Sequence, residues 1–450
     1  MSSNSVTLTA REHVFPLFVK YVSANVLGMI GYSCYILADT FFVARGIGSD
    51  AIAALNLVLP AFSLLNGTGL MIGMGAAARY SLSSGRADSE IHRTIFTQAL
   101  QLAFVAMLFF FSIGLFFARP LCVLLGADGT TLPHAIPYIS ILLMFSPLFL
   151  CNNLLNCFVR NDGEPRLSMT AMLVGSLTNI VLDIAFVIGL HMGVAGAALA
   201  TILSQALSAV LVLWVLMRTK DMHRLELRKI RFDGRMFHRI IRIGLPAGLQ
   251  SVMYTSSNIL IQSSVNALGT DTVAAWTAYS KIDSLFWMIV NAFGISITTF
   301  VGQNYGAGKM DRVHKGVRTC MGITAGATVL LSVILYNYAS ICYQLFTTDA
   351  QVVVIGEQIL HFLVPTYFTY IAIEILSGTL RGIGDSWLPM IICCLGICAL
   401  RVVWILTAVP LKNDILTIVF SYPLTWTVTS IAFIVYYLFF SRLKIVGRKR

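Results

Sequence analysis

The chain is 450 residues long, and charged residues make up 11% of it while hydrophobic residues make up 57%. About a quarter of the residues of an ordinary soluble domain are charged, so this composition excludes a soluble protein. Long windows such as residues 102–118, 194–217 and 329–346 contain no charge at all. Such windows predict helices that cross a membrane, each of which needs about 20 apolar residues.

In chain order, the apolar windows predict an all-α integral membrane protein with twelve transmembrane helices. The strands of a membrane barrel would instead be about 10 residues long and would alternate in polarity. The first window is longer than a signal-peptide core of about 7 to 15 residues and is expected to remain as the first span. The expected spans are residues 16–43, 51–78, 94–118, 133–159, 166–190, 193–217, 241–267, 272–300, 316–338, 352–380, 386–410 and 415–440.

The net charge of +11 follows the loops of this predicted topology. If the N-terminus is cytoplasmic, 26 of the 31 Lys and Arg residues lie in cytoplasmic segments and 3 lie in outer loops. Cytoplasmic loops of membrane proteins carry such an excess of basic residues. We therefore expect both termini in the cytoplasm, contact with the lipid bilayer and no nucleic-acid partner.

The two halves of the chain repeat each other at a distance of 221 residues. The matching pairs are Gly48 and Gly269, Asp128 and Asp349, Arg160 and Arg381, Gly163 and Gly384, and Gly175 and Gly396. A repeat of six spans keeps its orientation, so the halves are related by an axis along the membrane normal. We expect an N-lobe (1–217), a basic cytoplasmic linker (218–240), a C-lobe (241–441) and a basic tail (442–450). Two pseudo-symmetric six-helix lobes around a central cavity are the architecture of an alternating-access transporter.

Two carboxylates, Asp39 and Asp183, lie inside spans of the N-lobe. An ionisable group at mid-membrane costs about 3 kcal/mol on insertion scales and usually marks an ion or substrate pathway. Asn179 lies four residues before Asp183 and Tyr35 four residues before Asp39, so each pair shares a helix face. These oxygens suit a proton or a hard cation such as Na⁺. The alternative is that each acid only hydrogen-bonds a neighbour and holds the helices together.

The C-lobe contains a second possible polar group, formed by Asp283, Glu374, Arg401 and Gln250. This group either takes part in ion coupling or only packs, with Glu374 and Arg401 as a neutralising pair that joins two helices. Lys281 and Asp283 are two residues apart and point to different helix faces, so they are not expected to pair.

Two motifs typical of enzymes are present but incomplete. GIGD at residues 382–385 matches the GxGD pattern of intramembrane aspartyl proteases, yet it falls in a predicted cytoplasmic loop, where turn chemistry explains it. The segment 302–309 lacks the spacing of a phosphate loop, and Met310 stands where Ser or Thr would bind Mg²⁺. We therefore expect no enzyme, no cofactor and no use of ATP, so an ion gradient must drive transport.

Three motifs resemble signatures of the multidrug and toxic compound extrusion (MATE) family: LADTFFV at residues 37–43, GMGAAAR at 73–79 and VGQNYGAGK at 301–309. The resemblance covers nearly the whole chain and is greatest to the bacterial DinF-like branch. It implies a monomeric exporter in the bacterial cytoplasmic membrane that expels small organic, often cationic or amphipathic, compounds in exchange for H⁺ or Na⁺. It also implies a cation site, with Na⁺ as one candidate ion, whose members are Asp39, Asn179, Asp183 and Thr201.

The sequence departs from the NorM-like branch of that family, which has carboxylates in its seventh and tenth spans. Here the seventh span has no acid and the tenth has Glu374, so we expect coupling in the N-lobe. An alternative is a flippase or exporter of a lipid-linked or metabolite substrate in the same superfamily. Flippases for anionic head groups tend to carry several cationic residues in the cavity, whereas only Lys281 and Arg401 lie well inside spans here. This favours a cationic or neutral substrate and leaves the coupling ion open.

Overall fold

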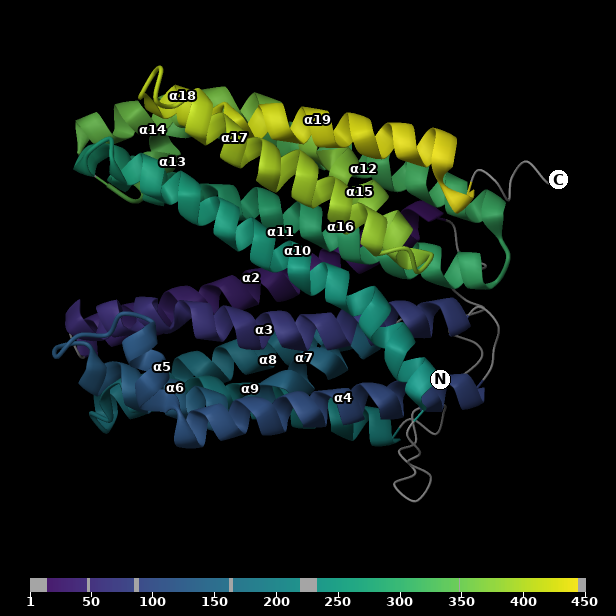
Figure 1. Ribbon diagram of the computed structural model, residues 1–450, viewed down its shortest axis with the longest axis horizontal. Coiled ribbons are helices and arrows are strands. Elements are labelled where there is room, and N and C mark those ends of the chain that lie inside the picture. The colour runs from purple at the N-terminus through teal and green to yellow at the C-terminus, as the bar shows by residue number, and fades with distance from the viewer. Residues whose placement is uncertain are drawn as a thin grey trace. The chain divides into compact units, whose positions relative to one another are not determined.

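The computed structural model describes residues 14–46, 49–84, 89–161, 165–218, 233–347 and 349–443, and in these residues every regular element is a helix. Figure 1 labels the helices along the chain. Those of the first half are α2 (Val14–Gly46), α3 (Ser49–Ser84), α4 (Ser89–Phe116), α5 (Ala118–Leu124), α6 (Leu132–Met144), α7 (Ser146–Asn161), α8 (Pro165–Asp183) and α9 (Gly193–Arg218). A π-helical segment, Ile184–Gly189, extends α8.

The second half follows the same order. Its helices are α10 (Gly234–Asn266), α11 (Thr270–Gly306), α12 (Met310–Asn337), α13 (Ala339–Gln344), α14 (Ala350–Leu363), α15 (Phe368–Gly382), α16 (Trp387–Cys393), α17 (Leu400–Thr407), α18 (Ile415–Val419) and α19 (Ser421–Val435). Short 3-10 or π-helical segments, Val364–Thr366, Cys394–Ala399 and Tyr436–Phe440, continue α14, α16 and α19.

Each of the twelve predicted spans coincides with one helix or one run of consecutive helices. In the described residues, nine spans are long and apolar enough to cross a membrane, and two further spans are bent helix pairs. The bends measure 53° between α6 and α7 and 51° between α14 and α15. The remaining span, α10, has 33 residues and is long enough to cross, although it is richer in polar residues.

The structural breaks repeat at the distance found in the sequence. The short helices α5 and α13 begin at Ala118 and Ala339, which are 221 residues apart. Asp128 and Asp349, at the same distance, accept backbone N–H groups at the start of the fourth span of each half. The hydrogen bonds from Thr131 and Thr130 hold the pKa of Asp128 well below its usual value. Both halves thus place an acid that accepts backbone N–H groups just before the fourth span.

Glycines at the loops of the second half adopt backbone angles that other residues avoid. Gly269, Gly308 and Gly384 have φ values of 106°, 72° and 85°, which lie in the left-handed region that favours glycine. Their counterparts in the first half, Gly48, Gly85 and Gly163, lie outside the described residues.

The chain divides into two compact units, which are residues 23–248 and residues 14–22 with 249–443 in the described part. The borders fall inside α2 and α10. Within the second unit, the Phe18 ring at the start of α2 lies 5.1 Å from the Phe300 ring of α11. Within the first unit, Gly244 at the start of α10 approaches the carbonyl oxygen of Met71 in α3 so closely that a Cβ atom would clash. The two ends of α2 therefore belong to different units, and the same is true of α10.

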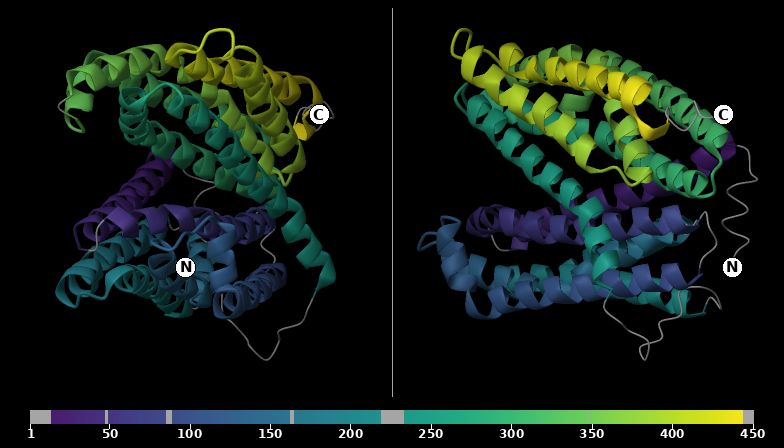
Figure 2. Two further views of the ribbon diagram at one scale, coloured as in Figure 1. Left: turned by 60° about the vertical axis from the view of Figure 1, so that its left-hand side comes forward. Right: turned by 45° about the vertical axis from the view of Figure 1, so that its right-hand side comes forward.

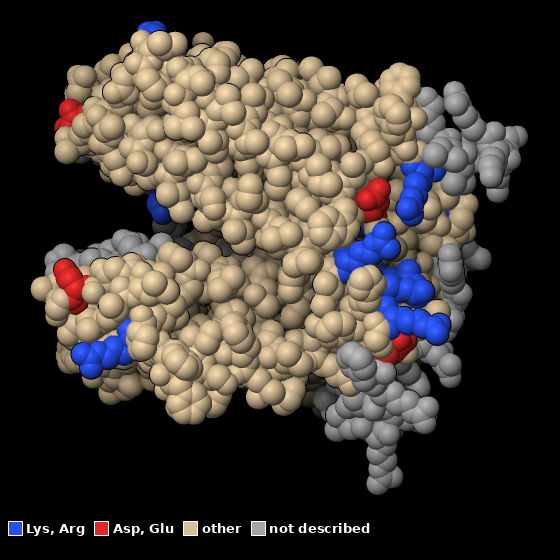
Figure 3. All heavy atoms as spheres, viewed as in Figure 1, with Lys and Arg blue, Asp and Glu red and all other residues tan. Residues whose placement is uncertain are grey.

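Within each unit, long helices pack side by side, as the two further views also show (Figure 2). In the first unit α3 packs on α7, and α8 on α9; in the second unit α11 packs on α12, α14 and α15. Charged side chains on the visible face lie toward the helix ends, and the middle parts of the helices are almost without charge (Figure 3). This distribution is the one that a hydrocarbon layer requires.

Candidate functional site

The N-lobe candidate site lies between α8 and α9. Asn179 and Asp183 of α8 are 1% and 0% exposed, and Thr201 of α9 is 3% exposed. The Asn179 amide nitrogen lies 3.5 Å from the Thr201 hydroxyl oxygen. Asn179 Oδ1 is buried and has no hydrogen-bond partner among the described residues. The structure thus brings Asn179 and Thr201 together and places Asp183 one turn further along the same buried face of α8.

Small residues allow α8 and α9 to approach closely enough for this contact. A Cβ atom at Gly175 would lie 3.3 Å from Ser208 Cβ and 3.4 Å from the Ser204 carbonyl oxygen of α9. Small residues at such crossings are typical of helix pairs in membranes. Asp183 is also the last residue of α8 before the π-helical segment, and π-helical turns are frequent at functional sites.

The other two predicted members of this site are only partly described. Tyr35 and Asp39 belong to α2, but their side chains lie outside the described residues.

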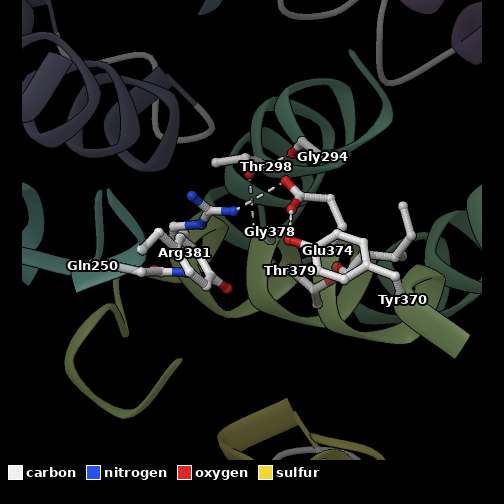
Figure 4. A network of polar contacts seen from close by, with 10 residues as sticks. Gln250, Gly294, Thr298, Tyr370, Glu374, Gly378, Thr379 and Arg381 are labelled. Atoms are coloured by element: carbon white, nitrogen blue, oxygen red, sulfur yellow. Dashed lines mark hydrogen bonds and ion pairs between the residues drawn. The ribbon is translucent and has the colours of Figure 1, made fainter. Parts of the chain in front are cut away.

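The C-lobe group separates into distinct sets of contacts, and Glu374 forms the first set (Figure 4). Its carboxylate accepts hydrogen bonds from Arg381 Nη2 and Tyr370 Oη, each at 3.4 Å. The carboxylate fills the space that a side chain at Gly294 would occupy. The cation that neutralises Glu374 is therefore Arg381, and the alternative of a Glu374–Arg401 pair is wrong. Arg381 follows Glu374 by seven residues, two turns of α15, so it reaches the same helix face.

The surroundings of Glu374 join α11 to α15. The Thr298 hydroxyl donates to the carbonyl oxygens of Gly294 at 2.7 Å and Gly378 at 3.0 Å. Gln250, the fourth predicted member of the C-lobe group, donates to Tyr254 Oη at 3.4 Å.

Asp283 forms the second set, and its partners are neutral. Its two carboxylate oxygens accept hydrogen bonds from Tyr367 Oη and Trp287 Nε1, each at 2.7 Å. The Tyr279 hydroxyl lies 3.3 Å from that of Tyr367. Asp283 is 8% exposed, so this acid is held by donors of aromatic side chains inside the C-lobe.

Arg401 of α17 forms the third set. Its Nη1 donates to Asn258 Oδ1 of α10 at 3.1 Å, and its guanidinium carbon lies 4.3 Å from the centre of the Tyr422 ring. The sequence interpretation missed Arg381, Tyr367 and Trp287. The spacing of seven residues could have identified Arg381, and the spacing of four residues from Asp283 could have identified Trp287 on the same helix. Tyr367 lies outside α11 and carries no local signal.

The two enzyme-like motifs form ordinary helix ends. In the GIGD segment, the Gly384 N–H donates to the Arg381 carbonyl and the Asp385 N–H to the Leu380 carbonyl, which closes a turn after α15. The segment 302–309 contains the end of α11 at Gly306 and the Gly308 turn.

Two repeated six-span halves with buried polar residues inside each half define a secondary transporter built from internal repeats. Comparison with known proteins names the family. The profile of the MatE family matches residues 25–185 and again residues 246–407, and the two matches begin 221 residues apart. The chain belongs to the MatE family of multidrug efflux transporters, so it is a membrane transporter and no enzyme.

Curated relatives agree with this assignment. The chain is 25% identical over 440 residues to "Probable multidrug resistance protein YoeA" of Bacillus subtilis, covering 96% of this chain and 94% of YoeA. It is 23% identical over 378 residues to "Multidrug export protein MepA" of Staphylococcus aureus, covering 84% and 83% of the two chains. It is also 26% identical over 336 residues to an "FAD transporter" of Shewanella oneidensis, covering 73% of each chain.

Solved structures show the same fold. An outward-facing multidrug resistance MATE family transporter of the MOP superfamily superposes with a TM-score of 0.92, 22% identity and 100% coverage of both chains. A MOP superfamily transporter from Pyrococcus furiosus gives a TM-score of 0.91, again with 22% identity and 100% coverage. The predicted twelve-helix fold class is confirmed.

Proposed function

We propose that the protein is an antiporter that exports organic, cationic or amphipathic compounds in exchange for H⁺ or Na⁺ by alternating access. The relatives of similar length that are named for multidrug export or resistance support this function. The protein works as a monomer in the bacterial cytoplasmic membrane, with both termini in the cytoplasm. The bias of its basic residues toward one set of loops supports this orientation.

The single observation that carries the coupling proposal is the buried set Asn179, Asp183 and Thr201 inside the N-lobe. A carboxylate that is 0% exposed in a transmembrane helix is costly and is kept for a purpose. The amide oxygen of Asn179 has no described hydrogen-bond partner, so it is available to an ion. Carboxylate, amide and hydroxyl oxygens are ligands for a hard cation, and the carboxylate also serves a proton.

Packing of α2 on α8 supports Asp39 as the fourth member. A Cβ atom at Gly28 would lie 3.2 Å from Met172 Sδ, and one at Gly31 would lie 2.6 Å from Leu173 Cδ2 and 3.6 Å from Ser176 Oγ. The residue numbers in contact rise in both helices at once, so α2 and α8 run parallel. Gly31 contacts Leu173 and Ser176 of α8, and α2 remains helical to Gly46. Eight residues further along both parallel helices, Asp39 of α2 is level with residues 181–184 of α8, which include Asp183.

In this mechanism one monovalent ion enters from outside, binds between the two carboxylates of the N-lobe and reduces their negative charge by one. The weaker negative charge no longer holds a cationic compound, which is released outward. Release of the ion into the cytoplasm restores the site for the next compound. The C-lobe acids are placed outside this cycle, because Glu374 has Arg381 as its cation and Asp283 has two aromatic donors.

A metabolite exporter is a second candidate function. The observation that favours it is the likeness to the relative named an FAD transporter, which covers 73% of this chain. FAD carries phosphates, so an exporter of such a compound needs basic groups within its spans.

Transport in proteoliposomes tests the proposal. Under separately imposed H⁺ and Na⁺ gradients, the wild type should move a lipophilic cationic dye with one of them, and Asp183→Asn or Asp39→Asn should abolish this dependence. Asp128→Asn is the matched control, because it makes the same change outside the predicted spans. The amide oxygen of the new asparagine can still accept the backbone N–H groups of Thr130 and Thr131. Gradient-driven transport that survives in Asp183→Asn would refute the coupling site. Transport that needs ATP and no gradient would refute antiport.

A further inference from the structure

Arg401 is a cation inside a transmembrane helix, and none of the described carboxylates pairs with it. It lies nine residues from the outer end of its predicted span, about 13 Å along the helix. Its side chain is 3% exposed. Among the described residues, no carboxylate lies within ion-pair distance of it. An arginine keeps its charge even when buried, so Arg401 is a positive charge inside the C-lobe that makes no ion pair with a described carboxylate.

The contacts of Arg401 hold the guanidinium in place without neutralising it. The Tyr422 ring supports one face at 4.3 Å and the Asn258 amide oxygen accepts from Nη1 at 3.1 Å. The Nε atom is buried and has no described hydrogen-bond partner. Tyr422 and Asn258 occupy one ring-facing side and one N–H group of the Arg401 guanidinium. A guanidinium held in this way can still bind a carboxylate or phosphate through two parallel hydrogen bonds. Tyr422 and Asn258 thus fix the direction in which the group points.

The helix that carries Asn258 has a polar stripe. Ser251, Thr255, Asn258 and Gln262 of α10 follow each other at spacings of four, three and four residues, so they share one face. Ser251, Thr255 and Asn258 are exposed, and Gln262 is half-buried. Polar groups in a transmembrane helix are tolerated where they line a water-filled route and are disfavoured against lipid. The stripe therefore offers a hydrated approach to the guanidinium.

We infer that Arg401, held by Tyr422 and Asn258, binds an anionic group, a carboxylate or a phosphate, of the exported compound. This inference rests on the proposed export function and narrows its substrate class. Compounds that carry an anionic group, alone or with a positive charge, are transported through this contact, and purely cationic compounds do not use it.

Two dyes that differ in one group provide the test. Rhodamine 110 has a free carboxylate, and rhodamine 123 is its methyl ester. In proteoliposomes, Arg401→Gln should reduce the initial rate of rhodamine 110 transport about tenfold, the loss expected for one hydrogen bond to a charged group. Rhodamine 123 transport should change less than about twofold. Arg119→Gln, the same substitution at an exposed residue beyond the third span, should leave both rates unchanged.

Asn258→Asp keeps the inference testable if Arg401→Gln does not fold. This change puts a carboxylate oxygen where Arg401 Nη1 now donates to an amide, so the chain supplies its own anion. It should reduce rhodamine 110 transport selectively while the protein stays folded. Equal effects on both dyes, no effect of either variant, or a wild type that moves only rhodamine 123 would overturn the inference and leave antiport standing. A wild type that moves neither dye under any gradient would instead refute the proposed export function.

Discussion

The two acids well inside the spans of the C-lobe, Asp283 and Glu374, illustrate different ways to keep a carboxylate inside a membrane. Glu374 has a cation, Arg381, at 3.4 Å, and both side chains are nearly buried, with exposures of 13% and 16%. Asp283 has two neutral donors at 2.7 Å. Removing one member of a buried charge pair leaves the other member without compensation, which is more costly than removing both.

At the residue scale, we therefore predict that the stability losses of Glu374→Ala and Arg381→Ala, added together, exceed the loss in the double variant. A double-mutant cycle, measured by thermal unfolding in detergent, should give a coupling free energy of about 1–3 kcal/mol. The pair of Glu374 with Arg401 serves as the control, with coupling near zero because Arg401 contacts Asn258 and Tyr422. Additive effects of Glu374→Ala and Arg381→Ala would contradict the contact.

At the scale of helices, glycines determine how closely neighbouring elements approach. Gly244 of α10 lies against the Met71 carbonyl of α3, and Gly75 of α3 lies against the Ile240 carbonyl of α10. Backbone atoms cannot move aside as the end of a flexible side chain can. The first turns of α10 therefore depend on two glycines at one crossing.

We expect Gly244→Ala to lower the free energy of unfolding by about 1–3 kcal/mol, the usual cost of overpacking. Gly326→Ala in α12 is the matched control, because no heavy atom lies within 4 Å of the added Cβ. There the higher helix propensity of alanine should stabilise by up to about 1 kcal/mol. Thermal unfolding followed by tryptophan fluorescence measures both changes, and a Gly244→Ala variant as stable as the control would disprove the close crossing.

At the scale of the whole molecule, charge and repetition predict the orientation in the membrane. Basic residues concentrate in alternate loops, and each half contains an even number of predicted spans, so both halves enter the membrane in the same direction. Capping acids, short helices and helix bends recur at the same distance in both halves. The two halves therefore have the same course through the bilayer.

Labelling of introduced cysteines tests this orientation. Lys412→Cys, at an exposed position in a predicted outer loop, should react with a membrane-impermeant maleimide in intact cells. Lys315→Cys, near the start of α12, should react only after the cells are permeabilised, because positive loops stay in the cytoplasm. Labelling is compared with the wild type, since Cys34 is an exposed native thiol. The reverse pattern would contradict the proposed topology.

The membrane class, the twelve spans and the repeat could all be predicted from the sequence. These features depend on the length and spacing of apolar runs and on the positions of charges, which are properties of short segments. The Asn179–Asp183 face could be predicted for the same reason, since four residues make one helical turn. Arg381 was within reach by the same periodicity, because it lies two turns beyond Glu374.

The sequence by itself therefore determined what kind of protein this is and which few ionisable residues enter the membrane. Only the tertiary structure decided which of the possible partners those residues meet: Glu374 with Arg381, Asp283 with Tyr367 and Trp287, and Arg401 with Asn258 and Tyr422. The physical reason is that most of these partners lie on other helices. Their contacts depend on how each helix is rotated and tilted against its neighbours, which is set by close packing across the whole lobe.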